Sequence, residues 1–183
     1  MDARAQRSRE HLREAVLTLA ARTPIADVTA SAICIAAGVT RDTFYRHAES
    51  PVDLLADALS AEIAESMAIL PRSDTIGDGE RALLKHVRVR ADVYRRAMHP
   101  LLAAPVRANL ERSIRSGLDL WVTLHPGILP SPFVDDPTAL RIAIAYAAAG
   151  TVGAIEEWLR SGDDDTDRAV SLILAASPEW WLR

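Results

Sequence analysis

The segment 29–50, TASAICIAAGVTRDTFYRHAES, constrains the fold more than any other part of the sequence. Its first half places Ile33 and Ala37 four residues apart, the spacing that puts two apolar side chains on one side of a helix. Gly38 follows and can adopt the left-handed backbone that ends a helix. Thr40 then has the side chain of a helix N-cap. The segment therefore predicts two short helices joined by a tight turn.

Apolar residues recur at helical spacing through most of the remaining chain, while aromatic residues make up only 5% of the 183 residues. Prolines and glycines separate these periodic segments at a few places. We therefore expect an all-α protein of about nine helices. The expected helices cover residues 9–22, 29–37, 41–47, 51–70, 79–98, a short segment between Pro100 and Pro105, 105–124, 138–161 and 165–176.

The polar stretch from Pro71 to Gly79 is the strongest boundary in the chain. It predicts an N-terminal domain over residues 1–50, extending into the helix 51–70, and a C-terminal domain over residues 71–183. Pro51 fits the first turn of that connecting helix, with Ser50 as its N-cap.

The second helix of the motif carries polar and aromatic side chains that suit DNA recognition. Arg can bind guanine, Thr can contact a thymine methyl group, and Tyr and His can bind phosphate. A short helix pair of this kind presents its second helix to the major groove. The alternative is an ordinary helical hairpin whose polar side meets water, which the joint pattern disfavours. The outward positions are Arg41, Thr43, Tyr45, Arg46 and His47.

Net charge supports this interpretation only weakly. The whole chain carries −4, but residues 1–50 hold seven Arg and six acidic residues, a balance of +1. The remaining residues are acidic, with a balance of −5.

The run VTASAICIAAGVTRDTFYRHAES…DLL resembles the DNA-binding domain of TetR-type transcriptional repressors over about residues 9–60. The matching features are Val28-Thr29, the turn Ala37-Gly38-Val39, and Thr43-Phe44-Tyr45 with His47. The resemblance implies a helix-turn-helix domain followed by a helical domain that binds a ligand and dimerises. The positions that it assigns to DNA binding are Thr29, Ser31, Thr40, Arg41, Asp42, Thr43, Tyr45, Arg46 and His47.

Two residues depart from the family pattern. Ala48 stands where a Phe is usual, and Pro51 stands where a Lys usually contacts phosphate. Losing one such contact should flatten the salt dependence of DNA binding by about one unit of slope. Arg4, Arg7 and Arg9 could compensate as a basic arm near the DNA.

Small residues line one side of the expected helix 138–161 and allow another helix to approach closely. They could pack within one subunit or form a dimer interface with the last helix. The run Gly-Thr-Val-Gly followed by Glu-Glu-Trp-Leu resembles the penultimate helix of TetR-type proteins, which favours a homodimer that reads a palindromic operator on double-stranded DNA. The interface candidates are Ala143, Ala147, Gly150, Gly153 and Ala154.

The resemblance also implies a pocket for a small-molecule effector among the middle helices, and the acidic, Ala- and Leu-rich composition suggests a small, fairly apolar one. The candidate pocket residues are His86, Tyr94, Met98, Trp121 and Tyr146, although a residue of each kind is more often a plain core residue than a ligand contact. We expect a transcriptional repressor that the effector releases from DNA, with no cofactor.

Other classes of function fit the sequence less well. The five histidines lack metal-ligand spacing, and no phosphate loop or nucleophile motif occurs, so we expect no enzyme, no catalytic residue and no metal site. Asp163-Asp164-Asp165 is expected to cap the last helix. Ala139–Ile155 falls short of a membrane span and no signal peptide opens the chain, so we expect a cytoplasmic protein without a membrane partner. The remaining alternative is a helical protein–protein interaction module with weak or lost specific DNA binding.

Overall fold

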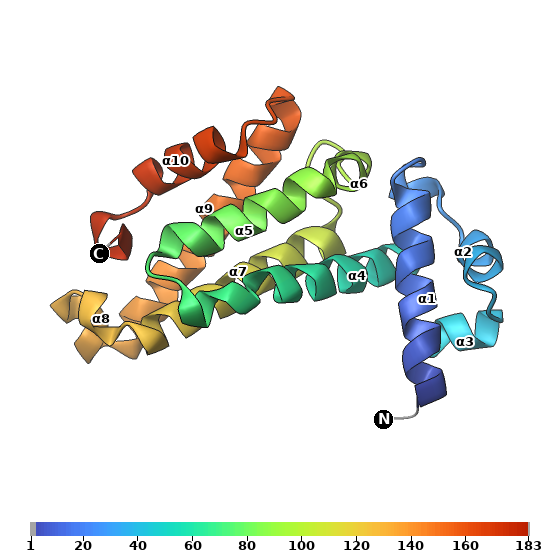
Figure 1. Cartoon of the computed structure of the whole chain (residues 1–183), viewed down its shortest axis with the longest axis horizontal. Helices are drawn as coiled ribbons and strands as arrows, with labels where there is room; N and C mark the ends of the chain where they lie inside the picture. The colour runs from blue at the N-terminus through green and yellow to red at the C-terminus, as the bar shows by residue number, and fades with distance from the viewer. Residues whose placement is uncertain (1–2, 183) are drawn as a thin grey trace. The chain divides into compact units, whose positions relative to one another are not determined.

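The computed structural model describes residues 3–182, and over this range the chain forms ten α-helices and no β-strand. The all-α prediction is therefore confirmed (Figure 1). The helices are α1 (Ala3–Ala20), α2 (Ala30–Ala37), α3 (Arg41–Tyr45), α4 (Pro51–Ser66), α5 (Ile76–Val89), α6 (Ala91–Arg96), α7 (Ala104–Leu124), α8 (Ser131–Asp135), α9 (Pro137–Ser161) and α10 (Thr166–Ala176).

The chain divides into two compact units that interleave along the sequence. Unit 1 contains the residues up to Glu62 together with Arg90–Asn109, and unit 2 contains Ile63–Val89 together with the residues from Leu110 onward. A single boundary near residues 71–79 was expected instead. The difference arises because α6 packs with the N-terminal helices, where Arg96 Nε donates a hydrogen bond to the carbonyl of Ala21 at 3.1 Å.

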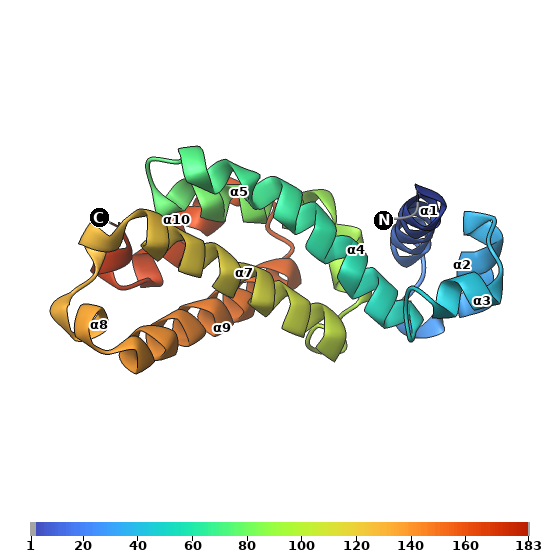
Figure 2. The same cartoon turned by 90° about the horizontal axis from the view of Figure 1, so that it is seen from below.

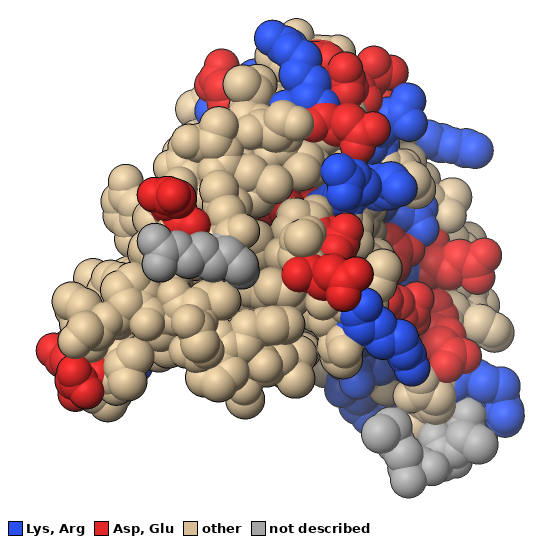
Figure 3. All heavy atoms as spheres, turned by 60° about the vertical axis from the view of Figure 1, so that its left-hand side comes forward, with Lys and Arg blue, Asp and Glu red and all other residues tan. Residues whose placement is uncertain are grey.

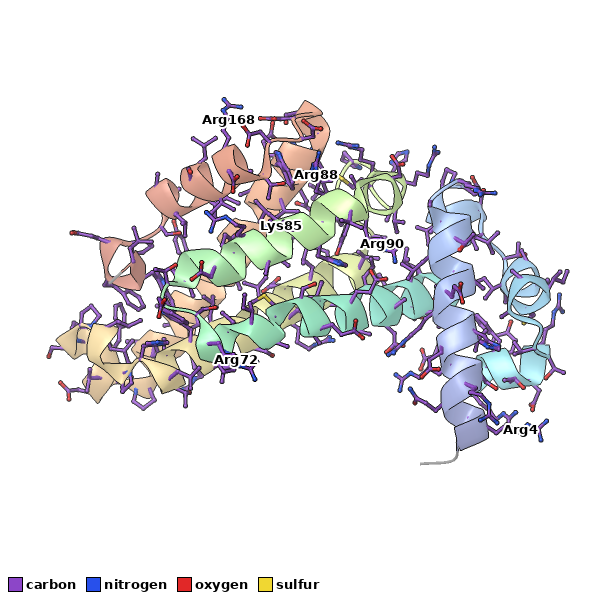
Figure 4. The ribbon with its side chains drawn as sticks, viewed as in Figure 1. Arg4, Arg72, Lys85, Arg88, Arg90 and Arg168 are labelled. Carbon is purple, nitrogen blue, oxygen red and sulfur yellow. The ribbon has the colours of Figure 1, made fainter. Side chains whose placement is uncertain are left out.

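Unit 1 is built on α1, which packs against α2. Leu12, Val16, Ile33 and Phe44 are completely buried and form the centre of its core. The start of α4 belongs to the same unit, and the Arg90 guanidinium forms an ion pair with Glu62 near the end of that part of the helix (Figure 4).

Unit 2 is a packed group of longer helices, in which α10 packs against α5 and both α7 and α9 contribute residues to one core cluster (Figure 2). Its core includes a cluster with two buried tryptophans, to which helices and 3₁₀ turns contribute. One turn is the 3₁₀ segment η2 (Met67–Arg72), which follows α4 directly, and another is η4 (Glu179–Leu182) at the end of the chain. The buried members of this cluster are Leu70, Trp121, Val122, Ile144 and Trp181.

The expected helix 79–98 is interrupted at Arg90, which separates α5 from α6. Arg90 has a ψ of 18°, outside the helical range, while its guanidinium is paired with Glu62. The break thus falls within a segment whose helical periodicity would continue through it. The short helix expected between Pro100 and Pro105 is absent from the described chain, where Met98 and Leu102 form an isolated antiparallel bridge instead.

The long helix α9 is 25 residues and is the one helix of the described chain that is long and apolar enough to cross a membrane by length and composition. The expected helix 138–161 is confirmed to within one residue, because Asp136 caps α9 at its start and Gly162 ends it. The whole helix is longer than the apolar run Ala139–Ile155, so the length of that run did not exclude a membrane span. Only 22% of its apolar window is buried, so α9 exposes an apolar side. That exposure equally suits an interface with another protein.

Candidate nucleic-acid interface

The turn between α2 and α3 has the predicted local chemistry. Gly38 ends α2 with a left-handed backbone, at φ 65°, where a side chain would be strained. The Thr29 hydroxyl accepts a hydrogen bond from the Ala32 amide at 3.2 Å, and the Thr40 hydroxyl accepts one from the Thr43 amide at 3.2 Å. Both helices are therefore capped as predicted.

Adjacent aromatic residues of α3 have opposite environments. Phe44 is completely buried, whereas Tyr45 is 61% exposed. Their rings meet edge to face with centroids 5.2 Å apart. Phe44 thus holds α3 on the core of unit 1 while the phenol of Tyr45 stays available to a partner.

Side chains on the outer side of the motif are arranged by polar contacts with one another. Arg41 Nε donates to the Ser31 hydroxyl at 3.1 Å and so connects α3 with α2. Arg46 donates to the Thr43 hydroxyl at 3.0 Å and lies 3.6 Å from the Asp42 carboxylate. These contacts are exposed, so each contributes little to stability and can be exchanged for phosphate or base contacts.

All nine residues assigned to DNA binding by resemblance lie on this motif and are at least partly exposed. One detail differs from the expectation. The recognition helix ends at Tyr45, so Arg46 and His47 lie in the turn that follows it.

A hollow of about 970 Å³ lies between α1 and the turn and recognition helix. Arg4, Arg7 and His11 line it from α1, and Arg46 and His47 line it from the other side. Arg4 extends from the first turns of α1 on the side where α3 lies (Figure 4). The motif therefore has a concave basic surface beside the recognition helix, which suits a phosphate backbone.

Arg9 does not belong to this basic arm, contrary to the expectation. Its guanidinium binds Asp57 of α4, with Nη2 and Oδ1 2.8 Å apart, and Arg13 Nε lies 2.8 Å from the other carboxylate oxygen. Partial burial raises the pKa of Asp57, but the hydrogen bonds from Arg13 and Arg9 outweigh it and hold that pKa below its ordinary value. Arg9 thus joins α1 to α4, and the arm reduces to Arg4 and Arg7.

The helix start at Pro51 is stabilised within the chain itself. The Ser50 hydroxyl accepts a hydrogen bond from the Asp53 amide at 3.3 Å and donates one to the Asp53 carboxylate at 2.5 Å. The predicted Ser50 cap is confirmed. The Asp165 side chain likewise caps α10 by accepting from the Arg168 amide at 2.9 Å, as expected of the acidic run.

The five residues suggested for an effector pocket do not share one environment. His86 and Trp121 are buried in unit 2, Tyr94 is buried in unit 1, and Met98 is partly buried there. Tyr146 is 77% exposed on α9. Helical periodicity could not separate these cases, because the neighbouring helix decides whether an aromatic residue is covered.

A different residue, Glu80, lines a small cavity of unit 2 and was not among the residues expected there. The signal that could have identified it is its place in the series Ile76, Glu80, Leu83, which puts a carboxylate on the apolar side of α5.

The exposed side of α9 carries the small residues predicted for a dimer interface. No atom lies within 4 Å of a β-carbon built on Gly150 or Gly153, so both face open space. Ile142 and Tyr146 on the same helix, and Leu172 on α10, are 65%, 77% and 59% exposed. Ala147, by contrast, packs on the core of unit 2. A broad surface with few charged side chains also covers the end of unit 2 that carries α8 and η4 (Figure 3).

Across residues 3–182, no group of three or more His, Cys, Asp or Glu side chains lies where it could hold a metal ion. Cys34 is buried in α2.

No protein-family model and no curated protein match the sequence. Solved structures do match its fold. The fatty acid degradation regulator FadR from Bacillus halodurans superposes with a TM-score of 0.63 at 15% identity, over 91% of this chain and 94% of that one. A TetR transcriptional regulator from Rhodococcus sp. RHA1 gives 0.57 at 22% identity, over 92% and 97%. The structure of a SmeT–triclosan complex gives 0.53 at 18% identity, over 92% and 90%.

Proposed function

The chain has the fold of TetR-type transcriptional regulators, and from this premise we propose that it is a ligand-responsive, DNA-binding transcriptional regulator. The observation that carries the proposal is the capped helix-turn-helix of unit 1. Its recognition helix is fixed by the buried Phe44, while Arg41 and Tyr45 remain exposed beside a concave basic surface. A regulator of this kind acts in the cytoplasm, where the DNA lies.

The regulator would act as a homodimer. A helix-turn-helix monomer presents too few contacts to bind a specific site tightly, and a twofold pair reads a palindromic operator. The support is the exposed apolar side of α9, with Ile142, Tyr146, Gly150 and Gly153 four, four and three residues apart. Together with Leu172 of α10, this side would form a helical interface with its copy.

Gly153→Glu should convert the dimer to a monomer, because a charged side chain would enter a closely packed, apolar interface. Size-exclusion chromatography with light scattering measures the mass directly. The matched control is Gly127→Glu, a second glycine with open space around its β-carbon and outside α9 and α10. A Gly153→Glu protein that stays dimeric would place the interface elsewhere.

The effector would work by changing how many molecules of the regulator are in a conformation able to bind DNA. A small molecule that binds better to a state unable to contact both half-sites lowers DNA affinity by the ratio of its affinities for the two states. The SmeT structure is a complex with triclosan, a small organic compound, and SmeT has the same fold as this chain. We expect the regulator to repress transcription. Transcription of the operator-linked gene in vitro, measured with and without the protein, would determine this.

The function is tested by fluorescence-polarisation binding to DNA from upstream of the protein's own coding sequence. The protein should bind one palindrome at least about 10³-fold more tightly than unrelated duplexes of equal length. Arg41→Ala combined with Tyr45→Ala should abolish this preference, because those side chains reach base edges and phosphates. Arg72→Ala, an exposed arginine of unit 2, should leave it unchanged (Figure 4). Equal, weak binding to every duplex would contradict the proposal and favour a protein–protein interaction module.

A further inference from the structure

Unit 2 contains a small cavity between η2, α5 and α7, with a volume of about 30 Å³. This is room for one or two water molecules or a similarly small group. The residues around it are apolar except for one carboxylate. They are Met67, Leu70, Ile76, Gly79, Glu80, Leu83, Ile114, Gly117 and Leu118.

Glu80 has an unsatisfied acceptor at this cavity. Its Oε1 is buried and has no hydrogen-bond partner, although the residue as a whole keeps partial exposure. Burial raises its pKa from 4.5 to about 7, and no neighbouring cation opposes that rise. A buried carboxylate without a partner is costly, and a ligand that supplies donors and positive charge removes that cost.

Two glycines that line the cavity lie against side chains of η2. A β-carbon on Gly117 would lie 2.9 Å from the Met67 terminal methyl group, and one on Gly79 would lie 2.6 Å from a Leu70 methyl group. Leu70 belongs to the buried core, whereas Met67 is only partly buried. Met67 is therefore the movable part of the wall, since its unbranched side chain can change rotamer at little cost.

We propose that this cavity is the effector site and that it takes the amino group of a small organic amine. The ammonium donates to Glu80 Oε1 in the existing cavity, and the apolar remainder of the molecule takes the place of the Met67 side chain. The inference rests on the proposed function and assigns the chemical class of its effector.

The lining discriminates between related molecules. An alcohol of the same length offers one donor and no charge, so it leaves the carboxylate without a counter-ion. A carboxylic acid brings a second negative charge to an enclosed site and is rejected. An apolar molecule leaves Oε1 unsatisfied.

Met67 lies where a movement caused by ligand binding could reach the helix-turn-helix motif through α4. Met67 begins η2, which follows α4 without a break, and α4 begins at Pro51, next to the Ser50 cap that closes the motif segment. A ligand that moves Met67 therefore acts on the end of the helix that connects unit 2 with unit 1.

The test uses isothermal titration calorimetry on the full chain at pH 8, with n-hexylamine, n-hexanol and hexanoate as probes. Hexylamine should bind about tenfold or more tightly than hexanol, and hexanoate should not bind. Glu80→Gln should remove the preference for the amine. Met67→Ala should tighten hexylamine binding while keeping that preference. Glu65→Gln, an exposed carboxylate on α4, is the control and should match the unmodified protein.

Operator binding is measured on the same preparations without any amine. Equal binding of amine and alcohol, or an unchanged preference in Glu80→Gln, overturns the assignment of this cavity even when the operator is bound. Amine binding that depends on Glu80 in a protein that recognises no operator would support the cavity chemistry and contradict the regulatory function instead.

Discussion

Replacing Phe44 with Ala should destabilise unit 1 by about 3–4 kcal/mol, the cost of removing a fully buried aromatic side chain. The ring is completely covered, so its loss leaves a cavity beside the helix-turn-helix as well as lost apolar burial. This is a large part of the roughly 5–15 kcal/mol that ordinarily separates folded from unfolded domains. Urea denaturation followed by circular dichroism measures the change.

The control for this variant is the next residue. Tyr45→Ala removes a ring of similar size from a position that is 61% exposed, so it should cost less than about 1 kcal/mol. Tyr45→Ala should nevertheless weaken DNA binding in the operator assay, whereas Phe44→Ala weakens it only by unfolding the motif. Similar stability losses in the two variants would show that α3 is not held by Phe44.

Glu80→Gln should remove a pH-dependent loss of stability. The folded protein raises the pKa of Glu80 from 4.5 to about 7, so the folded state binds this proton more tightly than the unfolded chain. The free energy of unfolding therefore falls as the pH rises from 4.5 through 7, and ionised Glu80 costs up to about 3 kcal/mol above that range. Below pH 4.5 the group is protonated in both states and contributes no difference.

The variant and the unmodified protein should thus be about equally stable near pH 4.5, and the variant should be more stable at pH 8 by about 2–3 kcal/mol. Urea denaturation at several pH values gives both curves. Among the residues that line the cavity, those from η2, α5 and α7 are uncharged apart from Glu80 itself, so no other lining group titrates. Glu65→Gln should keep the full pH dependence. Parallel curves for Glu80→Gln and the unmodified protein would contradict the burial of this carboxylate.

The helix-turn-helix could be predicted because its determinants are local. Thr29 and Thr40 cap helices within three residues of themselves, and Gly38 sets its own backbone conformation. The interruption of the middle helix at Arg90 could not be predicted, because the helical periodicity continues through it and the partner of the Arg90 side chain, Glu62, lies 28 residues away. The loss of Arg9 from the basic arm has the same origin, since its partner Asp57 lies 48 residues along the chain.

The effector candidates show a further limit of periodic patterns. The spacing that places Tyr94 and Tyr146 on helix faces does not reveal which face a second helix covers, and the structure buries one and exposes the other. Glu80 was overlooked for the opposite reason. In the sequence, a charged residue within an apolar helical series breaks the pattern and gives no sign of a site. In the structure, Glu80 is the one ionisable side chain among the residues that line the cavity.

The interleaving of the two units bears on how the protein is made. Synthesis of α3 is complete at residue 45, but α6 is made only after α5, which belongs to the other unit. Unit 1 needs this later segment, because Arg96 of α6 bonds to the carbonyl of Ala21 and the adjacent Arg90 pairs with Glu62. Unit 1 is therefore complete only when residue 109 has left the ribosome. The nascent chain therefore carries an unfinished helix-turn-helix unit while it begins to build the second unit.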